Sequence, residues 1–489
     1  SYCWGDQNDR ATISLNGSDF DVGQNLESCL RHLRLPSFDR FLWIDAICIN
    51  QGDFEERGQQ VLRMGKIYER ALTVRIWLGP EAARSNEAMQ WMVDSPRGRL
   101  FDTATHVVSQ LMCRPWFGRR WVIQEIAFAS EAVVHCGYLS VGLPLIWKVQ
   151  TKLYGSRWIA HTRPRNLSGT QTSTDSSGYW GDPEAQSATR LLFASENVFG
   201  SMLNDSGSRT TRLCDLQTLV EEFAGFGVSD PCDTIYALLP LAKDSHLWNP
   251  SYSKKVMEVY RDFIGHSVET SGSLDILLRP WARSYRNLPS WVGVNHGPKF
   301  AIAGGRSLRQ HAELFIGPPQ SRIYSASGDL KPSINFPDFS QSGIPQLQVA
   351  GILLDTVAEE RGPSTAGFPI INWPEWALEA VQRRGTDVAT CNLDDLLRTG
   401  SFPGEEHFPV IFTRRWLVTQ GGKLGLGPAR TAICDKVVIL LGCSVPVILR
   451  KEDRGYVIIG ECFIQGAMDG EVVQGIKDGT QELQEFLLI

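Results

Sequence analysis

The first 140 residues alternate between short apolar runs and longer amphipathic segments. Phe41 to Asp45 is an apolar run that ends in an acid, which is typical of a buried parallel strand. Glu55 to Leu72 has apolar residues at helical spacing and charges on its other face. Two further runs, Thr73 to Leu78 and Ala132 to Cys136, predict strands. The alternation predicts an α/β domain whose sheet is mostly parallel, with helices on both faces. Ligands of such sheets bind beyond the carboxyl ends of the strands.

The rest of the chain has a different pattern of apolar, Gly and Pro residues. Helical patterns return between residues 141 and 300, which include a loop rich in Ser, Thr and Gly at 163–189. Beyond residue 300, short β-like runs are separated by Gly and Pro. We therefore expect three parts: the α/β domain at 1–140, a helical region at 141–300 and a β-rich C-terminal region at 301–489.

Composition narrows the classes of function. The net charge of −6 over 489 residues argues against general nucleic-acid binding, because that needs a basic face. The 11 cysteines are scattered singly, several of them in apolar runs, as are Cys48, Cys136 and Cys434. We expect reduced, buried thiols and no metal site. No apolar run reaches the roughly 18 residues that suggest a membrane span. These features predict a cytoplasmic protein without a cofactor.

The segment from Trp43 to Asp53 is the first candidate for chemistry. A buried strand would deliver the Asp45 carboxylate to the carboxyl edge of the sheet, and the polar turn after it would bring Cys48 and Asn50 there. In the alternative interpretation, Asp45 and Asn50 only organise a turn through hydrogen bonds to the backbone. Asp53 then caps the next helix.

The segment from Arg114 to Glu125 is the second candidate. On a helix, Trp121 and Glu125 are four positions apart and share a face. A carboxylate beside aromatic rings and arginines suits catalysis, since burial raises its pKa while arginines lower it and attract phosphate groups. An Arg–Glu pair that only holds the start of the helix explains the spacing equally well.

Two glycine-containing stretches carry weaker signals. From Tyr2 to Asp6, the end of a strand is followed by Gly5, which lets a ligand approach the backbone closely. Gly422 to Gly427 lies in the β-rich region without a helix after it, so we expect a hairpin or tight turn there.

Together these motifs resemble those of the fungal heterokaryon-incompatibility (HET) domain. Four matches stand in the family's order, and later stretches such as Asp230 to Leu239 and Leu288 to Val292 resemble regions that often follow this domain. The four matches are Ser1-Tyr2-x-Trp4-Gly5-Asp6, Trp43-Ile44-Asp45-x-x-Cys48-Ile49-Asn50-Gln51, Glu56-Arg57 with Gln60-Val61 through Ala71, and Arg114-x-Trp116-Phe117-x-Arg119-x-Trp121-x-x-Gln124-Glu125.

HET domains are regarded as distant relatives of TIR domains, so the resemblance implies a TIR-like, flavodoxin-like fold. In TIR-type NAD hydrolases, a helix with a Trp-x-x-x-Glu pattern presents the catalytic glutamate, and Trp121 with Glu125 fits that pattern. The resemblance implies that Glu125 stabilises the oxocarbenium-like ribose as nicotinamide leaves, or attacks it. Trp4 and Trp121 would stack on a ring, and Arg57 or Arg119 would meet the pyrophosphate. The residues expected to bind substrate are Tyr2, Trp4, Gly5, Asp6, Asp45, Cys48, Asn50, Arg57, Arg119 and Trp121.

The resemblance also implies a role in fungal non-self recognition and programmed cell death. Our leading hypothesis is a cell-death effector with NAD as its substrate, activated by self-association and by an unidentified protein partner. The first alternative is a non-catalytic module that signals by assembly. The second is a HET-like fold repurposed as a small-molecule enzyme of secondary metabolism, whose pocket would be apolar and aromatic.

Overall fold

The computed structural model describes residues 1–150 (apart from 7, 83 and 95–101), 188, 191, 214–283, 288–295, 315–317, 322–337, 345–362, 373–387 and 414–489. The chain divides into two compact units, residues 1–159 with 175–255 and residues 160–174 with 256–489. The loop predicted at 163–189 lies outside the described residues, apart from residue 188.

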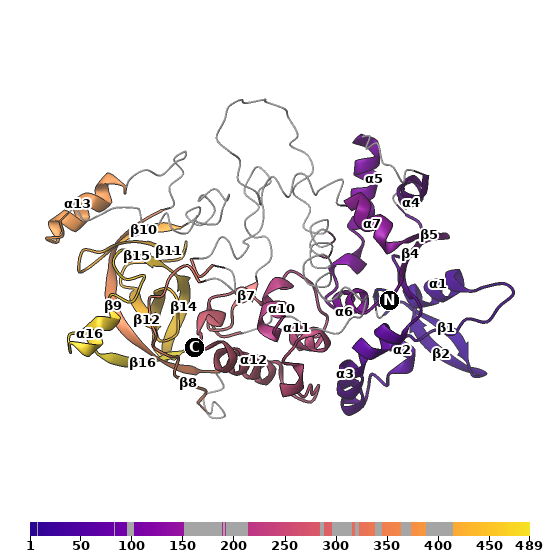
Figure 1. Cartoon of the computed structure of the whole chain (residues 1–489), viewed down its shortest axis with the longest axis horizontal. Helices are drawn as coiled ribbons and strands as arrows, with labels where there is room; N and C mark the ends of the chain where they lie inside the picture. Colours follow the sequence, from indigo (N-terminus) through magenta and orange to yellow (C-terminus); the bar gives the residue numbers. More distant parts are fainter. Residues whose placement is uncertain are drawn as a thin grey trace, which may run out of the picture. The chain divides into compact units, whose positions relative to one another are not determined.

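The first unit contains a short sheet (Figure 1). Its strands β3 (Val74–Trp77), β4 (Ala132–Cys136) and β5 (Leu139–Gly142) lie in that order. Strands β3 and β4 are parallel, as predicted, whereas β4 and β5 are antiparallel. Tyr2 adds a parallel bridge to Trp77, whose amide donates to the Ser1 carbonyl at 2.9 Å. This bridge places the N-terminal motif beside β3.

The strand predicted from Phe41 to Asp45 is wrong. Residues 39–44 form no strand, and Asp45 instead begins the short helix α2 (Asp45–Cys48). Phe41 is 99% exposed, so the first part of the run contributes nothing to the core. Only its second part packs inward, where Ile44 contacts the apolar cluster around Leu26 and Trp77.

A β-hairpin that the sequence analysis did not predict precedes the first helix. Strands β1 (Arg10–Leu15) and β2 (Ser18–Gly23) pair antiparallel. The two residues between them, Asn16 and Gly17, have φ angles of 53° and 79°. A two-residue turn with positive φ at both positions matches the twist of the flanking strands, and Asn-Gly is a favoured pair for it.

The helices of this unit include α3 (Phe54–Arg70), which confirms the predicted periodicity. The carboxylate of Asp53 accepts hydrogen bonds from the Glu55 and Glu56 amides, so Asp53 is the predicted cap. The other helices are α1 (Gln24–Leu33), α4 (Ser85–Asp94), α5 (Asp102–Met112), α6 (Trp121–Ala127), α7 (Leu143–Gln150), α10 (Leu216–Glu222) and α11 (Asp233–Tyr236), with 3-10 turns at Pro115–Gly118, Leu239–Leu241 and Ser245–Leu247.

The second unit is dominated by a nine-stranded sheet in which five strands close into a barrel (Figure 1). The ring runs from β9 through β12, β13, β14 and β16 and back to β9. The long strand β9 (Leu347–Arg361) closes it, because it pairs with β16 on one edge and with β12 on the other. The β-rich C-terminal sheet is confirmed, and β10 and β11 form the hairpin predicted at Gly422 to Gly427. The remaining strands are β8 (Ile334–Asn335), β10 (Arg415–Thr419), β11 (Leu424–Gly427), β12 (Lys436–Leu440), β13 (Val447–Glu452), β14 (Gly455–Glu461), β15 (Phe463–Ile464) and β16 (Leu483–Leu488).

A buried ion pair lies in this unit beside its apolar core. The guanidinium of Arg414 donates to both the carboxylate and the carbonyl of Glu461, and both side chains are almost fully buried. Arg414 also lies over the ring of Phe315 at 4.1 Å. Because both charges are out of water, each depends on the other for its stabilisation.

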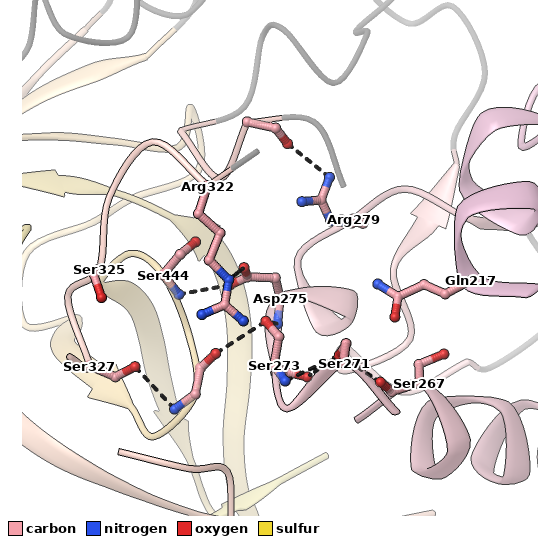
Figure 2. A network of polar contacts seen from close by, with 12 residues as sticks. Gln217, Ser267, Ser271, Ser273, Asp275, Arg279, Arg322, Ser325, Ser327 and Ser444 are labelled. Carbon is pink, nitrogen blue, oxygen red and sulfur yellow. Dashed lines mark hydrogen bonds and ion pairs between the residues drawn. The ribbon is translucent and has the colours of Figure 1, made fainter. Parts of the chain in front are cut away.

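A network of polar contacts ties the segment after α12 (Val256–Ser271) to the loop between β12 and β13 (Figure 2). The buried carboxylate of Asp275 accepts from the Ser444 amide at 2.8 Å. Ser273 donates to the Gly442 carbonyl at 3.2 Å, and the Gly442 amide donates to Ser327 Oγ at 3.2 Å. The unit also contains α13 (Glu375–Arg383), α16 (Val473–Lys477), the 3-10 turn Asp275–Leu277 and a parallel pair of β6 (Ala282–Arg283) and β7 (Val294–Asn295).

The expected buried thiols are only partly observed. Cys136 is buried, but Cys48 and Cys434 are exposed. Cys48 ends the short helix α2, and Cys434 has a φ of 74° just before β12, so both lie at turns rather than inside apolar elements. Among the helices that the structure describes, none is long and apolar enough to cross a membrane.

Candidate functional site

Glu125 lies on α6 and is only 3% exposed. Its Oε2 accepts a hydrogen bond from Ser1 Oγ, and Ser1 Oγ in turn accepts from the indole of Trp116 at 2.8 Å. Two of the sequence motifs, 115 residues apart, therefore meet at this carboxyl group. The bonds hold Glu125 against the segment that runs beside β3.

Arg119 precedes α6 and is close to two carboxyl groups. Its guanidinium donates to the Tyr2 carbonyl. Burial acts to lower the pKa of Arg119, but the nearby groups that carry negative charge, first Glu125 and then Cys3 and Asp45, raise it above its usual value. Arg119 thus stays charged and holds the N-terminal motif next to Glu125.

Asp45 joins the same site from the start of α2. Its Oδ2 accepts from the Trp4 indole at 2.9 Å, and its Oδ1 accepts from the Ala46 amide at 2.9 Å. The neighbouring Gly5 has a φ of 73°, a conformation that glycine adopts at little cost. The structure therefore brings together the predicted residues Tyr2, Trp4, Gly5, Asp45, Arg119 and Glu125.

Tyr68 is a member of this site that sequence reasoning missed. It lies on α3, is buried, and makes an edge-to-face contact with Trp43 at a centroid distance of 5.9 Å. Burial raises the pKa of the Tyr68 hydroxyl well above its usual value, and the charges of Glu125 and Asp45 raise it further. Helical spacing assigned Tyr68 to an apolar face, and nothing local in the sequence shows where its hydroxyl points. We call Tyr2, Asp45, Tyr68, Arg119 and Glu125 the Glu125 cluster.

Arg57 and Trp121 contact a different acid. Arg57 pairs with Asp230 at 3.1 Å and with Asp233 at 3.7 Å, and lies over the Tyr252 ring at 3.5 Å. The Trp121 indole donates to Asp233 Oδ2 at 3.0 Å, and the Tyr252 hydroxyl donates to Oδ1 at 2.6 Å. These five residues, the Asp233 cluster, tie α3 and α6 to the segment around α11. Arg57, which was expected to meet a pyrophosphate, pairs with these two acids instead of with Glu125 or Asp45.

The remaining predicted residues are exposed and organise turns. Asp6 accepts from the Asn8 amide at 2.9 Å, and Asn50 accepts from the Gly52 amide at 3.2 Å. Cys48 is exposed at the end of α2. These contacts match the structural interpretation of the polar turn, in which side chains satisfy nearby backbone amides.

The Glu125 cluster has two acidic side chains and one basic one, a formal charge of −1. Such a site favours a group that is cationic or that becomes cationic during a reaction, and it disfavours phosphate. Within the described part of the chain, no group of three or more His, Cys, Asp or Glu residues could hold a metal ion.

Comparisons with known proteins identify the family. The family model for heterokaryon incompatibility protein (HET) matches residues 1–125, a range that ends at Glu125. Residues 1–125 of the chain are similar to the HET domain. The family predicted from four ordered motifs is thereby confirmed, and the Glu125 cluster lies wholly within the HET domain. A second family model, the Het-6 β-barrel domain, matches residues 403–489, which hold strands β10 to β16.

One curated relative is similar to this chain over the whole length of the chain. "Heterokaryon incompatibility protein 6, OR allele" of Neurospora crassa is 24% identical over 640 residues, which cover 100% of this chain and 91% of that protein. No solved structure matches the chain.

Proposed function

We propose that this HET-domain protein acts in fungal non-self recognition and programmed cell death, in the cytoplasm, through self-association and a protein partner. The HET and Het-6 barrel matches and the relative's name, an incompatibility protein, support this role. The similarity to the incompatibility protein extends over both units of the chain. We therefore expect the HET domain and the barrel to act together.

We further propose that the HET domain hydrolyses NAD. The observation that carries this proposal is the buried carboxyl group of Glu125, which α6 presents in a Trp-x-x-x-Glu pattern close to Asp45 and Arg119. When the bond between ribose C1 and the nicotinamide nitrogen breaks, the bond electrons leave with the nicotinamide and the positive charge passes to the ribose. The Glu125 carboxylate would stabilise this oxocarbenium-like ribose or attack it, as carboxylates do in glycosidases. Water then adds at C1, which yields ADP-ribose and a proton.

The charge of the Glu125 cluster agrees with this chemistry better than with phosphate binding. Nicotinamide carries a positive charge in NAD, and the transition state moves that charge onto the ribose beside the carboxyl groups. A formally anionic site stabilises both states. Arg57, predicted to bind pyrophosphate, is paired with Asp230 and Asp233, so phosphates of the substrate would lie outside the cluster.

Nicotinamide release tests the proposal directly. The purified full chain is incubated with NAD and nicotinamide is measured by chromatography, for wild type, Glu125→Gln and the exposed control Glu87→Gln. Since Gln keeps the shape of Glu but not its charge, we expect loss of at least 100-fold in rate only at Glu125, a roughly 3 kcal/mol effect typical of removing a catalytic electrostatic group. No release by wild type at high protein concentration, or equal release by Glu125→Gln, overturns the hydrolase proposal.

A non-catalytic assembly module is the alternative, and one observation favours it. The hydrogen-bonded chain from Trp116 through Ser1 to Glu125 gives this carboxyl group a structural task. If the variant Glu125→Gln keeps its toxicity in cells and cellular NAD stays constant, the HET domain signals by assembly.

The repurposed small-molecule enzyme would need a ligand-sized apolar cavity, and one cavity in the described part of the second unit is far smaller than that. The cavity lined by Met257, Trp291 and Phe336 has a volume of about 10 Å³, room for one water molecule.

A further inference from the structure

The hydroxyl of Ser1 lies between two buried side chains of the HET domain. Its Oγ accepts a hydrogen bond from the Trp116 indole at 2.8 Å and donates one to Oε2 of Glu125. The backbone of Ser1 is anchored as well, because its carbonyl accepts from the Trp77 amide at 2.9 Å. Trp116 is 1% exposed and Glu125 is 3% exposed, so water competes little for these bonds. The three side chains form a short hydrogen-bonded chain that ends at the carboxyl group of Glu125.

The chemistry of the three groups fixes the direction of this chain. An indole N–H can only donate, so the oxygen of Ser1 is the acceptor in its bond with Trp116. A hydroxyl has a single hydrogen, and that hydrogen is then free to point at Glu125. Oε2 of Glu125 must accept it and therefore carries no proton. The other carboxyl oxygen, Oε1, takes no part in the chain of bonds from Trp116.

We propose that Ser1 is a positioning residue for NAD hydrolysis: its hydroxyl holds Oε2 of Glu125 and leaves Oε1 to face the ribose. The inference rests on the proposed function and names how its carboxylate is oriented. A hydrogen bond to one oxygen restricts rotation of the carboxyl group before the substrate arrives, so less freedom is lost in the reaction. The bond is strongest to an ionised carboxylate, which is the form that stabilises or attacks an oxocarbenium-like ribose.

Two substitutions of the same shape test the role of the hydroxyl. Thr and Val are both β-branched, and only Thr keeps a hydroxyl. Nicotinamide release from NAD is measured on the full chain for wild type, Ser1→Thr and Ser1→Val, with Ser14→Ala at an exposed position of β1 as the control. We expect Ser1→Val to lower kcat about 10- to 100-fold with little change in KM, because a hydrogen bond to a charged group is lost. Ser1→Thr and the control should stay within about 3-fold of wild type.

A double-mutant cycle separates positioning from a contact that only supports the fold. In the Glu125→Gln background, Ser1→Val should lower kcat no further, because the hydroxyl acts through that carboxylate. Trp116→Phe removes the donor to Ser1, so it should lower kcat by a smaller factor of about 2 to 10 and should have no further effect in Ser1→Val. Thermal unfolding of every variant shows whether a lower rate reflects a loss of folded protein.

The outcomes distinguish this inference from the hydrolase proposal. Nicotinamide release with equal kcat in Ser1→Thr and Ser1→Val overturns the positioning role and leaves the hydrolase standing. Losses from Ser1→Val and Glu125→Gln that multiply fully overturn the positioning role as well. Wild type that releases no nicotinamide overturns both proposals. If Ser1→Val does not fold, Ser1→Ala, which removes only the hydroxyl, takes its place in the same cycle.

Discussion

The Asp233 cluster leads to a prediction about how pH affects the first unit. Asp233 is buried on α11 and receives hydrogen bonds from Tyr252 and Trp121. Burial raises the pKa of Asp233 to about 6, against the lowering effects of these hydrogen bonds and of Arg57. We predict that Asp233→Asn, which cannot ionise, removes a pH-dependent contribution to stability that the wild type has.

The sign and the size follow from linkage. The pKa of Asp233 is about 6 in the folded chain, whereas an aspartic acid ordinarily has a pKa of 3.8. Folding therefore favours the protonated acid. This contribution is complete below about pH 4 and is lost as the pH rises through 6. The pKa of Asp233 rises by about two units on folding, which corresponds to roughly 3 kcal/mol of unfolding free energy. About half of this stabilisation is lost between pH 5 and pH 8. For a unit of this size, that is roughly 3–6 °C in melting temperature.

Thermal unfolding of wild type and Asp233→Asn from pH 5 to pH 8 provides the assay. The melting temperature of wild type, relative to that of the variant, should fall by this amount as the pH rises. In Arg57→Gln the fall should be larger and extend to higher pH, because Arg57 lowers the pKa of Asp233. A constant difference, or wild type gaining on Asp233→Asn as the pH rises, would refute the reasoning and make the Arg57 pair the dominant interaction.

Two further variants test the packing. Gly58→Ala on α3 would place a Cβ 2.7 Å from the Pro250 carbonyl oxygen. We expect urea titration to show a loss of about 1–3 kcal/mol in unfolding free energy. The control Gly52→Ala, whose Cβ would have no atom nearer than 3.5 Å, should stay close to wild type. In the second unit, Arg414→Met leaves Glu461 buried without its guanidinium, and denaturant titration should show a loss of about 3–5 kcal/mol; a change below about 1 kcal/mol would mean that water reaches Glu461.

Several periodic elements of the fold were predicted from the sequence, whereas the β1–β2 hairpin and the irregular segments were not. Helix α3 and strands β3 and β4 carry their own periodic signal, because one face of each meets the core. The run from Phe41 to Asp45 was wrongly predicted as a strand because the prediction assumed that its apolar side chains are buried. Phe41 is exposed instead. Closure of the barrel through β9 depends on pairings of residues far apart in the chain, which no local pattern encodes.

The same distinction holds for the candidate site. Glu125, Asp45 and Arg119 stand in motifs and were predicted, although how they meet depends on Ser1 and Trp4. The role of Arg57 was missed because its partner Asp230 lies 173 residues further along the chain. Tyr68 was missed because a tyrosine at a helical core position has the same spacing whether its hydroxyl faces a site or not.

Strand β9 has a practical consequence for anyone who wants to isolate the C-terminal part. The Het-6 barrel match begins at residue 403, but β9 at 347–361 fills the gap between β12 and β16. A fragment cut at residue 403 would expose the unpaired edges of both strands, and such edges are templates for intermolecular pairing and aggregation. A separate peptide covering residues 345–362 should occupy the position of β9 and restore the ring of strands. The barrel would then form by complementation of two fragments.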